Sequence, residues 1–283
     1  MAQLKFWRRL RLGVQLAFFA LVVYLAAQHH LAPAETAPSL HSLCPFGAIA
    51  SIGTVISAGV LVPKLHPSNI VLGVALLASL IVVGPVFCGW VCPLGTLQDL
   101  LTRVKRKLRI KEVVVRGKAA LVLGSLRFVV LGLVVAATFG TAKLVFAPYD
   151  PYHAIFSLNW LFEPGELLPI TLVITGLVLL LSLFVRRAWC RFLCPLGAFN
   201  SLFARFSLLR LKQSKSCSDC GICRACCPLD SEPGVNPVSD PCVMCMDCTM
   251  ACRREGVGLI GPLSVPRRAV SVAVTGSGAA KED

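Results

Sequence analysis

Residues 217–227 read CSDCGICRACC, and residues 242–252 read CVMCMDCTMAC. Each has the spacing C-x2-C-x2-C-x3-C, the bacterial pattern for [4Fe–4S] ligation, in which the fourth cysteine of a run serves the other cluster. The pattern predicts two [4Fe–4S] clusters with crossed ligands. The first ligand set is Cys217, Cys220, Cys223 and Cys252, and the second is Cys242, Cys245, Cys248 and Cys227. Cys226 is surplus and is expected to be a buried or bystander thiol.

Zinc and disulfides are the alternative interpretations of these cysteines. A structural zinc site takes four ligands, typically as two C-x2-C pairs, and two complete runs of four fit two cubanes better. Disulfides need an oxidising compartment, whereas the charge pattern places this stretch in the cytosol. We therefore expect a small α+β ferredoxin domain of the bacterial two-cluster type over residues 216–258, followed by a disordered tail over residues 259–283.

The composition indicates a membrane protein. Hydrophobic residues make up 56% of the 283 residues and charged residues 15%, against about 25% charged in soluble proteins. The net charge of +14 could indicate nucleic-acid binding, but the positive residues lie in blocks beside apolar runs, as the positive-inside rule requires. We expect a lipid bilayer as partner, no nucleic acid, and a multi-pass protein of the bacterial cytoplasmic membrane.

The apolar runs predict an α-helical membrane domain over residues 1–215. Its four spans are expected at about 12–30, 69–87, 121–142 and 167–185. The segment 103–118 holds eight basic residues and one acid, so it must be cytoplasmic, and both termini then lie in the cytosol. The short, soft stretch 48–62 is expected to be re-entrant or interfacial, since a further span there would turn the basic segment outward.

Two features of these spans stay open. The basic start and short apolar run of residues 1–27 also fit a cleaved signal peptide, although an uncleaved anchor is favoured. Either Arg127 or Lys143 falls near the apolar layer. That cation either snorkels to the interface or stands beside a cluster or a quinone head group.

An internal repeat follows two of the predicted spans. Residues 87–98 read FCGWVCPLGTLQ, and residues 189–200 read WCRFLCPLGAFN. Cysteines at positions i and i+4 share one helical face, so two such pairs at one membrane face would supply four thiolates. We predict that they hold a further cluster, with structural thiols as the alternative. The four cysteines are Cys88, Cys92, Cys190 and Cys194. Cys44, in a degenerate third copy, is placed outside and is not assigned as a ligand.

Basic amphipathic stretches follow both copies of the repeat. Apolar residues recur at helical spacing from Leu94, which predicts a helix on the inner membrane surface, and a second such stretch runs to Lys215. Residues 217–256 are net acidic, so the ferredoxin stretch is expected to dock on the basic segment 103–118 through charge that salt would screen.

Paired C-x3-C-P motifs at the inner ends of spans, with a C-terminal double ferredoxin run, resemble the NapH/NosR-like family of membrane polyferredoxins, nearest the compact NapH type. The resemblance covers most of the chain from about Cys44 onward. It implies an electron-transfer subunit of a quinol-oxidising system, which would exchange electrons between the quinone pool and a membrane or periplasmic redox partner. A metal-reducing assembly factor for a respiratory oxidase, as in CcoG-like relatives, and a membrane redox sensor are the alternatives. No catalytic acid, base or nucleophile is expected.

Overall fold

The computed structural model describes most of the predicted membrane domain and most of the cysteine-rich stretch. The described residues are 2–31, 68–115, 117–141, 146, 149–162, 169–214, 217–218, 220–233, 241–252 and 256–261. The predicted re-entrant segment 48–62, Cys44, Lys143 and the tail from residue 262 onward lie outside these ranges.

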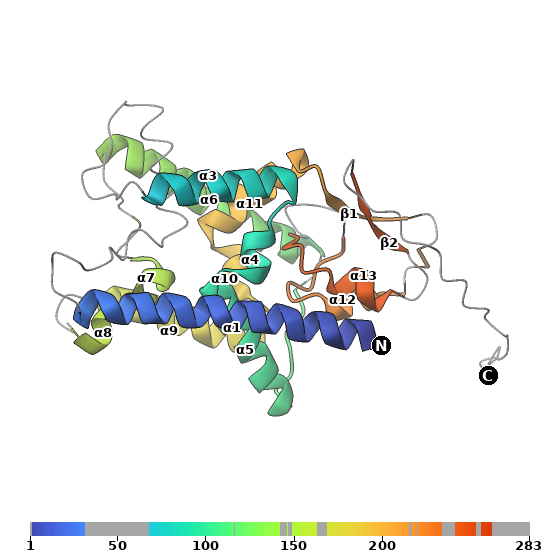
Figure 1. The fold of residues 1–283 in the computed structure, drawn as a ribbon, viewed down its shortest axis with the longest axis horizontal. Coiled ribbons are helices and arrows are strands. Elements are labelled where there is room, and N and C mark those ends of the chain that lie inside the picture. The colour runs from blue at the N-terminus through green and yellow to red at the C-terminus, as the bar shows by residue number, and fades with distance from the viewer. Residues whose placement is uncertain are drawn as a thin grey trace.

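Four long apolar helices dominate the described part of the fold (Figure 1). They are α1 (Ala2–Leu31), α3 (Ser68–Val82), α6 (Gly117–Thr141) and α9 (Pro169–Phe184). Two stretches within α1 and α6, Leu4–Leu31 and Gly117–Thr138, are long and apolar enough to cross a membrane. α3 and α9 are also apolar but have 15 and 16 residues, and 16 residues span about 24 Å of a bilayer core of about 30 Å.

Apolar side chains cover the outward faces of these helices. Val71, Val122 and Val173 are 71%, 70% and 69% exposed. A single exposed apolar residue is ordinary, but rows of them on several neighbouring helices need a cover. Lipid provides one, because helices satisfy their backbone hydrogen bonds internally. The exposed faces and the two long apolar helices together indicate a membrane protein.

The second predicted span ends earlier than the expected limit of 87. α3 stops at Val82, and a separate short helix, α4 (Val86–Trp90), follows. Gly84 between them has φ of +92°, a conformation that glycine adopts without strain, and Pro85 has no N–H to continue the helix. The fourth span ends in a similar way, because α9 stops at Phe184 and α10 (Ala188–Phe192) begins after a turn.

Two further helices begin directly after the second cysteine of each repeat copy. α5 (Pro93–Lys107) is the helix expected from Leu94, and α11 (Pro195–Phe203) is its counterpart. Proline at the first helical position is favoured, since that N–H has no partner in the helix. The second basic stretch does not stay helical to Lys215. It passes through a 3-10 turn, η3 (Ala204–Phe206), into the strand β1 (Arg210–Gln213).

The C-terminal module, defined here as residues 210–261, combines one small sheet with two short helices. β1 pairs antiparallel with β2 (Val257–Ile260), with Arg210 opposite Ile260. α12 (Ile222–Cys226) and α13 (Asp247–Ala251) pack beside the sheet. The first strand of the sheet thus precedes the domain start expected at residue 216.

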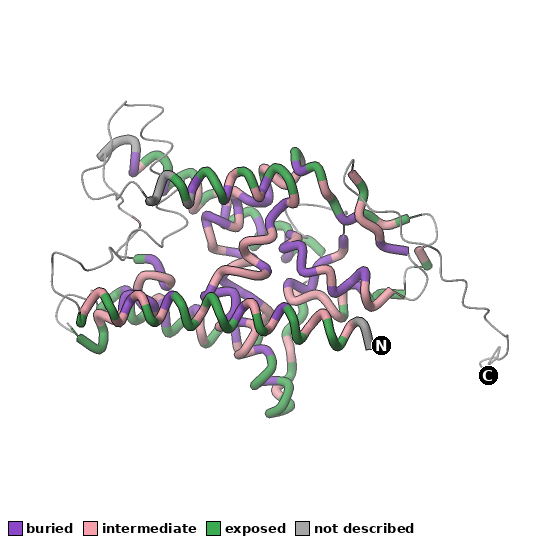
Figure 2. The backbone as a smooth tube through the Cα atoms, in the orientation of Figure 1, coloured by how far each residue is buried: buried purple, intermediate pink, exposed green. Residues whose placement is uncertain are grey.

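Figures 1 and 2 show where the module meets the helical part. The first turns of α1 lie against α13, whereas the other end of α1 lies near α7 (Pro151–Phe156) and α8 (Asn159–Phe162). Buried residues concentrate in the middle of the molecule, around α4 and α10 (Figure 2). Both copies of the repeat therefore lie at the centre of the fold.

Candidate functional site

The two copies of the repeat have the same local geometry. Cys92 and Cys194 cap α5 and α11 with nearly equal backbone angles, φ/ψ of −60°/116° and −67°/118°. A Cβ atom on Gly95 would lie 2.9 Å from the carbonyl oxygen of Cys88, and one on Gly197 would lie 2.8 Å from that of Cys190. Only glycine lets the helix start approach the first cysteine this closely, which explains the Cys-Pro-Leu-Gly sequence of both copies.

The fold brings the two cysteine pairs together. Burial raises the pKa of Cys88, and the thiols of Cys92 and Cys190 raise it further. The pKa of Cys194 is also raised by burial, and then by Cys190 and Cys88. Each of these thiols therefore lies within electrostatic range of the opposite pair, and thiols that disfavour one another's ionisation would be stabilised as thiolates by a bound metal.

Each copy of the repeat carries a buried side-chain amide three residues after its Pro-Leu-Gly sequence. Asn200 is 2% exposed, and its Nδ2 donates to the Sγ of Cys88 over 3.0 Å. Gln98 occupies the equivalent position in the first copy and is fully buried. Within the described residues, neither amide atom of Gln98 has a hydrogen-bond partner. A buried amide without partners is costly and calls for a reason.

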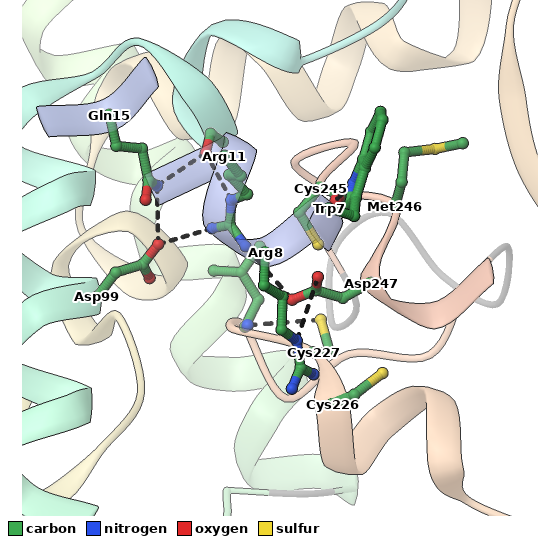
Figure 3. Close-up of polar contacts among 12 residues, drawn as sticks. Trp7, Arg8, Arg11, Gln15, Asp99, Cys226, Cys227, Cys245, Met246 and Asp247 are labelled. Atoms are coloured by element: carbon green, nitrogen blue, oxygen red, sulfur yellow. Dashed lines mark hydrogen bonds and ion pairs between the residues drawn. The ribbon is translucent and has the colours of Figure 1, made fainter. Parts of the chain in front are cut away.

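A buried chain of charges connects the repeat to the module (Figure 3). Arg187 is fully buried, donates to the carbonyl oxygen of Cys88 over 2.9 Å, and pairs with both oxygens of Asp99 at 2.7 Å. Arg11 lies 2.6 Å from Asp99 and 3.4 Å from Asp247 on α13. Burial alone would raise the pKa of Asp99, but Arg187 and Arg11 hold it below its ordinary value, so Asp99 stays ionised between two cations.

Arg127 is the counterpart of Arg11 in the second copy. Arg11 donates through Nε to the carbonyl oxygen of Gly89, and Arg127 donates through Nη1 to that of Arg191, the equivalent residue. Arg127 is fully buried and lies within electrostatic range of Cys194. Of the two interpretations left open for this cation, the structure thus favours a position beside the cysteine site over snorkelling.

The module docks on the repeat through its 243–245 loop. A Cβ on Gly89 would lie 2.3 Å from the carbonyl oxygen of Val243, so the backbones are in direct contact. Trp7 and Trp90 pack edge to face, with ring centroids 5.2 Å apart, and donate to the carbonyl oxygens of Cys245 and Met244.

Docking on the basic segment 103–118 is not what the described contacts show. Arg8 and Arg11 of α1 pair with Asp247 instead. On the other side, Arg186 donates to two carbonyl oxygens of the module, and Arg191 lies 3.7 Å from Asp230. The acidic character of the module is thus used, but by arginines near the start of α1 and shortly after α9 rather than by the basic segment.

The module cysteines gather in two groups. Burial raises the pKa of Cys223, and the thiols of Cys217, Cys252 and Cys220 raise it further. For Cys248 the neighbouring thiols that raise its pKa, after burial, are those of Cys245, Cys242, Cys227 and Cys226. The first group thus contains Cys252 of the second run, and the second group contains Cys227 of the first run together with the surplus Cys226. The thiol of Cys226 donates a hydrogen bond to the carbonyl oxygen of Cys223 over 3.3 Å.

Backbone N–H groups point at several of these sulfurs. The donors are Met244 to Cys242 and Leu229 to Cys227, both at 3.4 Å, and Gly256 to Cys252 at 3.2 Å. Hydrogen bonds to cysteine sulfur are a feature of iron–sulfur sites and tune their potential. No three His, Cys, Asp or Glu side chains of the described residues lie close enough to share one metal ion. All-cysteine groups with N–H donors do fit clusters, in which each thiolate binds a different iron.

The three cysteine groups follow one another through shared packing. Cys88 and Cys190 of the repeat and Cys227 all pack on one small core that contains Val243 and Cys245. A second core joins Cys223 to Cys248, with Cys226 and Cys242 at its edge. The repeat site therefore adjoins the Cys242–Cys248 group, which in turn adjoins the Cys217–Cys223 group.

Several residues of this site were not singled out from the sequence. They are Arg11, Asp99, Arg187 and Asn200. The alignment of the two repeat copies contained the signal for Asn200, because it places an amide side chain at residue 98 and again at residue 200. The ion pairs left no such signal, since basic residues at the ends of spans are expected in any case.

Comparison with known proteins agrees with this class of site. A family described as a 4Fe-4S binding domain matches residues 65–111 and 167–216, which contain the two copies of the repeat. The fold and the cysteine groups thus define an iron–sulfur electron-transfer protein. This family match and the similar proteins described below show that the chain belongs to the NapH/NosR-like family of membrane polyferredoxins.

Three relatives illustrate the family. The uncharacterized protein MJ0750 of Methanocaldococcus jannaschii is 32% identical over 217 residues, which are 76% of this chain and 85% of that protein. The methylamine utilization ferredoxin-type protein MauN of Methylobacillus flagellatus is 32% identical over 51% of this chain and 48% of its own length. The regulatory protein NosR of Stutzerimonas stutzeri is 29% identical over 67% of this chain, but only 26% of NosR is covered. No solved structure matches.

Proposed function

We propose that this protein relays electrons between the quinone pool and a redox partner through three iron–sulfur clusters arranged in a row. Two [4Fe–4S] clusters are held by the module, one by Cys217, Cys220, Cys223 and Cys252 and the other by Cys242, Cys245, Cys248 and Cys227. The third is held by Cys88, Cys92, Cys190 and Cys194. A quinol-oxidising system would use such a chain as its electron-transfer subunit.

The observation that carries this proposal is the shared core between the repeat and the module. Cys88 and Cys190 contact the same few apolar side chains as Cys227 and Cys245. An electron that reaches the repeat site would therefore have a short, dry path to the next group. The match of the 4Fe-4S family to both copies of the repeat, rather than to the module, independently supports a cluster at the repeat.

The residues around the row suit charged redox centres. Bound clusters would supply one-electron chemistry, and their thiolates carry negative charge that a buried site must balance. Arg187 and Arg11 provide positive charge from one side, and Arg127 from the other. Leu229 and Val243, 1% and 6% exposed, exclude water between the groups. Asn200 donates a hydrogen bond to a ligand sulfur.

The same contacts bear on topology. Trp7, Arg8 and Arg11 hold the module, so the start of α1 and the module share one side of the membrane. With the basic segment 103–118 on that side as well, the module lies in the cytosol by the positive-inside rule. Cleavage of a signal peptide would remove these three contacts, which supports α1 as a retained anchor of a multi-pass protein in the cytoplasmic membrane.

The test is a cluster count combined with reduction by quinol. The full chain, purified anaerobically in detergent, should contain iron and sulfide for three clusters, and a quinol analogue should reduce them. Serine at Cys88, Cys92, Cys190 and Cys194 should remove one cluster's share of iron and should slow reduction of the module.

Two outcomes would contradict the proposal. An unchanged iron content in the quadruple variant would remove the third cluster. Clusters that stay oxidised with excess quinol, yet are reduced readily by a soluble donor, would favour the metal-reducing assembly factor.

A further inference from the structure

Arginines from two helices surround a pocket beside the C-terminal module. The pocket has a volume of about 300 Å³ and lies between the first turns of α1, the middle of α5 and the loop that follows α12. Its basic residues are Arg8, Arg9, Arg11, Arg103 and Arg106. Asp99 and Asp247 also line it, so the lining carries three more positive than negative charges.

The two carboxylates are already engaged by other partners. Asp99 pairs with Arg11 and with Arg187 behind the pocket wall. Asp247 pairs with Arg11 and with Arg8 (Figure 3). These carboxylates therefore balance the inner arginines and leave the charge of the outer ones uncompensated.

Two of the outer arginines lack such compensation, and the third shares its carboxylate with two other cations. Over the described ranges of the chain, Arg9 and Arg103 take part in no ion pair. Arg106 lies 3.8 Å from Glu112, a carboxylate that Lys105 and Arg186 share. Like charges gathered around one concave site repel each other, and a bound anion relieves that repulsion.

Arg106 lies within electrostatic range of several other arginines. Its pKa is lowered first by burial and then by the positive charges of Arg186, Arg8 and Arg103, with Glu112 acting in the opposite sense. Arginines from α1 and α5 thus lie near enough to affect one another across the pocket. Their side chains line the same pocket instead of being spread over the surface.

We propose that this pocket binds the phosphate group of an anionic ligand. Guanidinium groups match phosphate oxygens with paired N–H donors, which makes arginine the preferred residue for such a site. A volume of about 300 Å³ lies at the lower end of ordinary ligand pockets and suits a head group rather than a large cofactor.

Two sources could bring the phosphate. Val104 and Leu108, neighbours of Arg103 and Arg106 in sequence, are 50% and 65% exposed. Apolar and basic side chains side by side at a helix end are typical of the bilayer interface, where basic pockets bind lipid head groups. A soluble phosphate compound from the cytosol would use the same arginines, and the experiment separates the two.

Occupancy would also act on the row of clusters. Cys226 and Pro228 form one wall of the pocket, and the residue between them, Cys227, is assigned to the second cluster. A phosphate anion there disfavours the more negative reduced state, so binding should lower the midpoint potential of that cluster. This consequence rests on the proposed function, whereas the binding itself does not.

The experiment titrates the detergent-purified full chain with two probes, short-chain phosphatidylglycerol and inorganic phosphate, and uses short-chain phosphatidylcholine as the zwitterionic comparison of zero net charge. The pocket variant carries Arg9→Gln and Arg103→Gln. The matched control carries Lys107→Gln and Arg109→Gln, which remove the same charge from exposed residues that do not line the pocket. Calorimetry gives the affinities, and iron content and EPR spectra show whether each variant keeps its clusters.

A lipid source predicts saturable binding of phosphatidylglycerol, about tenfold or more weaker in the pocket variant and little changed in the control. A soluble source predicts the same pattern for inorganic phosphate, with no preference for phosphatidylglycerol over phosphatidylcholine. Equal affinities in the two double variants, or no saturable binding of either probe, would overturn the proposal. An unmoved cluster potential with intact binding would count against the cluster assignment alone.

Discussion

Replacing Asn200 with leucine should lower the midpoint potential of the cluster assigned to the repeat cysteines. The side-chain amide donates to Cys88 Sγ over 3.0 Å and acts to lower the pKa of that thiol, so it favours negative charge on the sulfur. A reduced cluster carries one more electron than an oxidised one, and removal of the donor therefore penalises reduction.

The size of the shift follows from the hydrogen-bond energy. A hydrogen bond to a charged group contributes about 1.5–3 kcal/mol, and the two redox states share part of it. If about 1 kcal/mol distinguishes them, the potential falls by about 40 mV, since a tenfold change corresponds to about 59 mV for one electron. The fold should tolerate the change, because leucine has the same number and branching of side-chain heavy atoms and removes an oxygen, Oδ1, that has no partner among the described residues.

The assay is a potentiometric EPR titration of the full chain in detergent. Ser201→Ala is the matched control, because its hydroxyl donates to the carbonyl oxygen of Gly197 and not to a cysteine. The potentials of the module clusters should stay within error of wild type in both variants. A potential that stays unchanged or rises in Asn200→Leu, with all clusters present, would refute the assignment of Asn200 as a donor to a redox centre.

Three further changes test separate parts of the molecule. Gly89→Ala places a Cβ 2.3 Å from a backbone oxygen of the module, which should weaken the docking of the module by about 1–3 kcal/mol and speed the loss of module iron to a chelator. Gly132→Ala, with open space around the added Cβ, should lose iron as slowly as wild type. Equal rates of iron loss in the two variants would contradict this docking site. Burial raises the pKa of Asp150 to about 6, so its ionised form destabilises the fold above that pH. Asp150→Asn, which keeps the helix cap, should increase the free energy of unfolding at pH 8 by up to about 3 kcal/mol, measured as a higher melting temperature. The gain should fade as the pH falls from 6 to 4, and a gain that is independent of pH would contradict this. Cys226→Ser should retain both module clusters, whereas Cys227→Ser should lose one, and equal iron loss would show that the ligand was chosen wrongly.

The sequence was informative where one pattern has one physical meaning. The apolar runs predicted helices at all four places where α1, α3, α6 and α9 lie, and the repeat and cysteine runs indicated the family that the comparisons show. The end of α3 was misplaced because its apolar character continues to Phe87, although Gly84 and Pro85 already stop the helix. The local backbone preference there outweighed hydrophobicity.

The ion-pair network could not be predicted from the sequence for a different reason. Arg11 and Arg187 beside apolar runs satisfy the positive-inside rule whether they are solvated or buried. Only the fold brings Asp99, far from both in the chain, to within 2.7 Å of each. The docking site of the module was misjudged for the same reason, because net charge showed that the module needs basic partners but not which ones.

The duplicated geometry bears on the origin of the fold. Each half of the helical part, α1 to α5 and α6 to α11, contributes one arginine from its first helix and two cysteines to the central site. α5 packs on α9, and α11 packs on α3, so each half leans on the span of the other. One half alone supplies only two thiolates and leaves the helix faces that pack on the other half exposed. Two copies of a single half-length chain, paired as a homodimer, would bring together all four thiolates. After fusion of the two copies in one gene, the equivalent positions 89 and 191 could differ. Gly89 then allows the close approach of the module, and Arg191 pairs with Asp230 of the module.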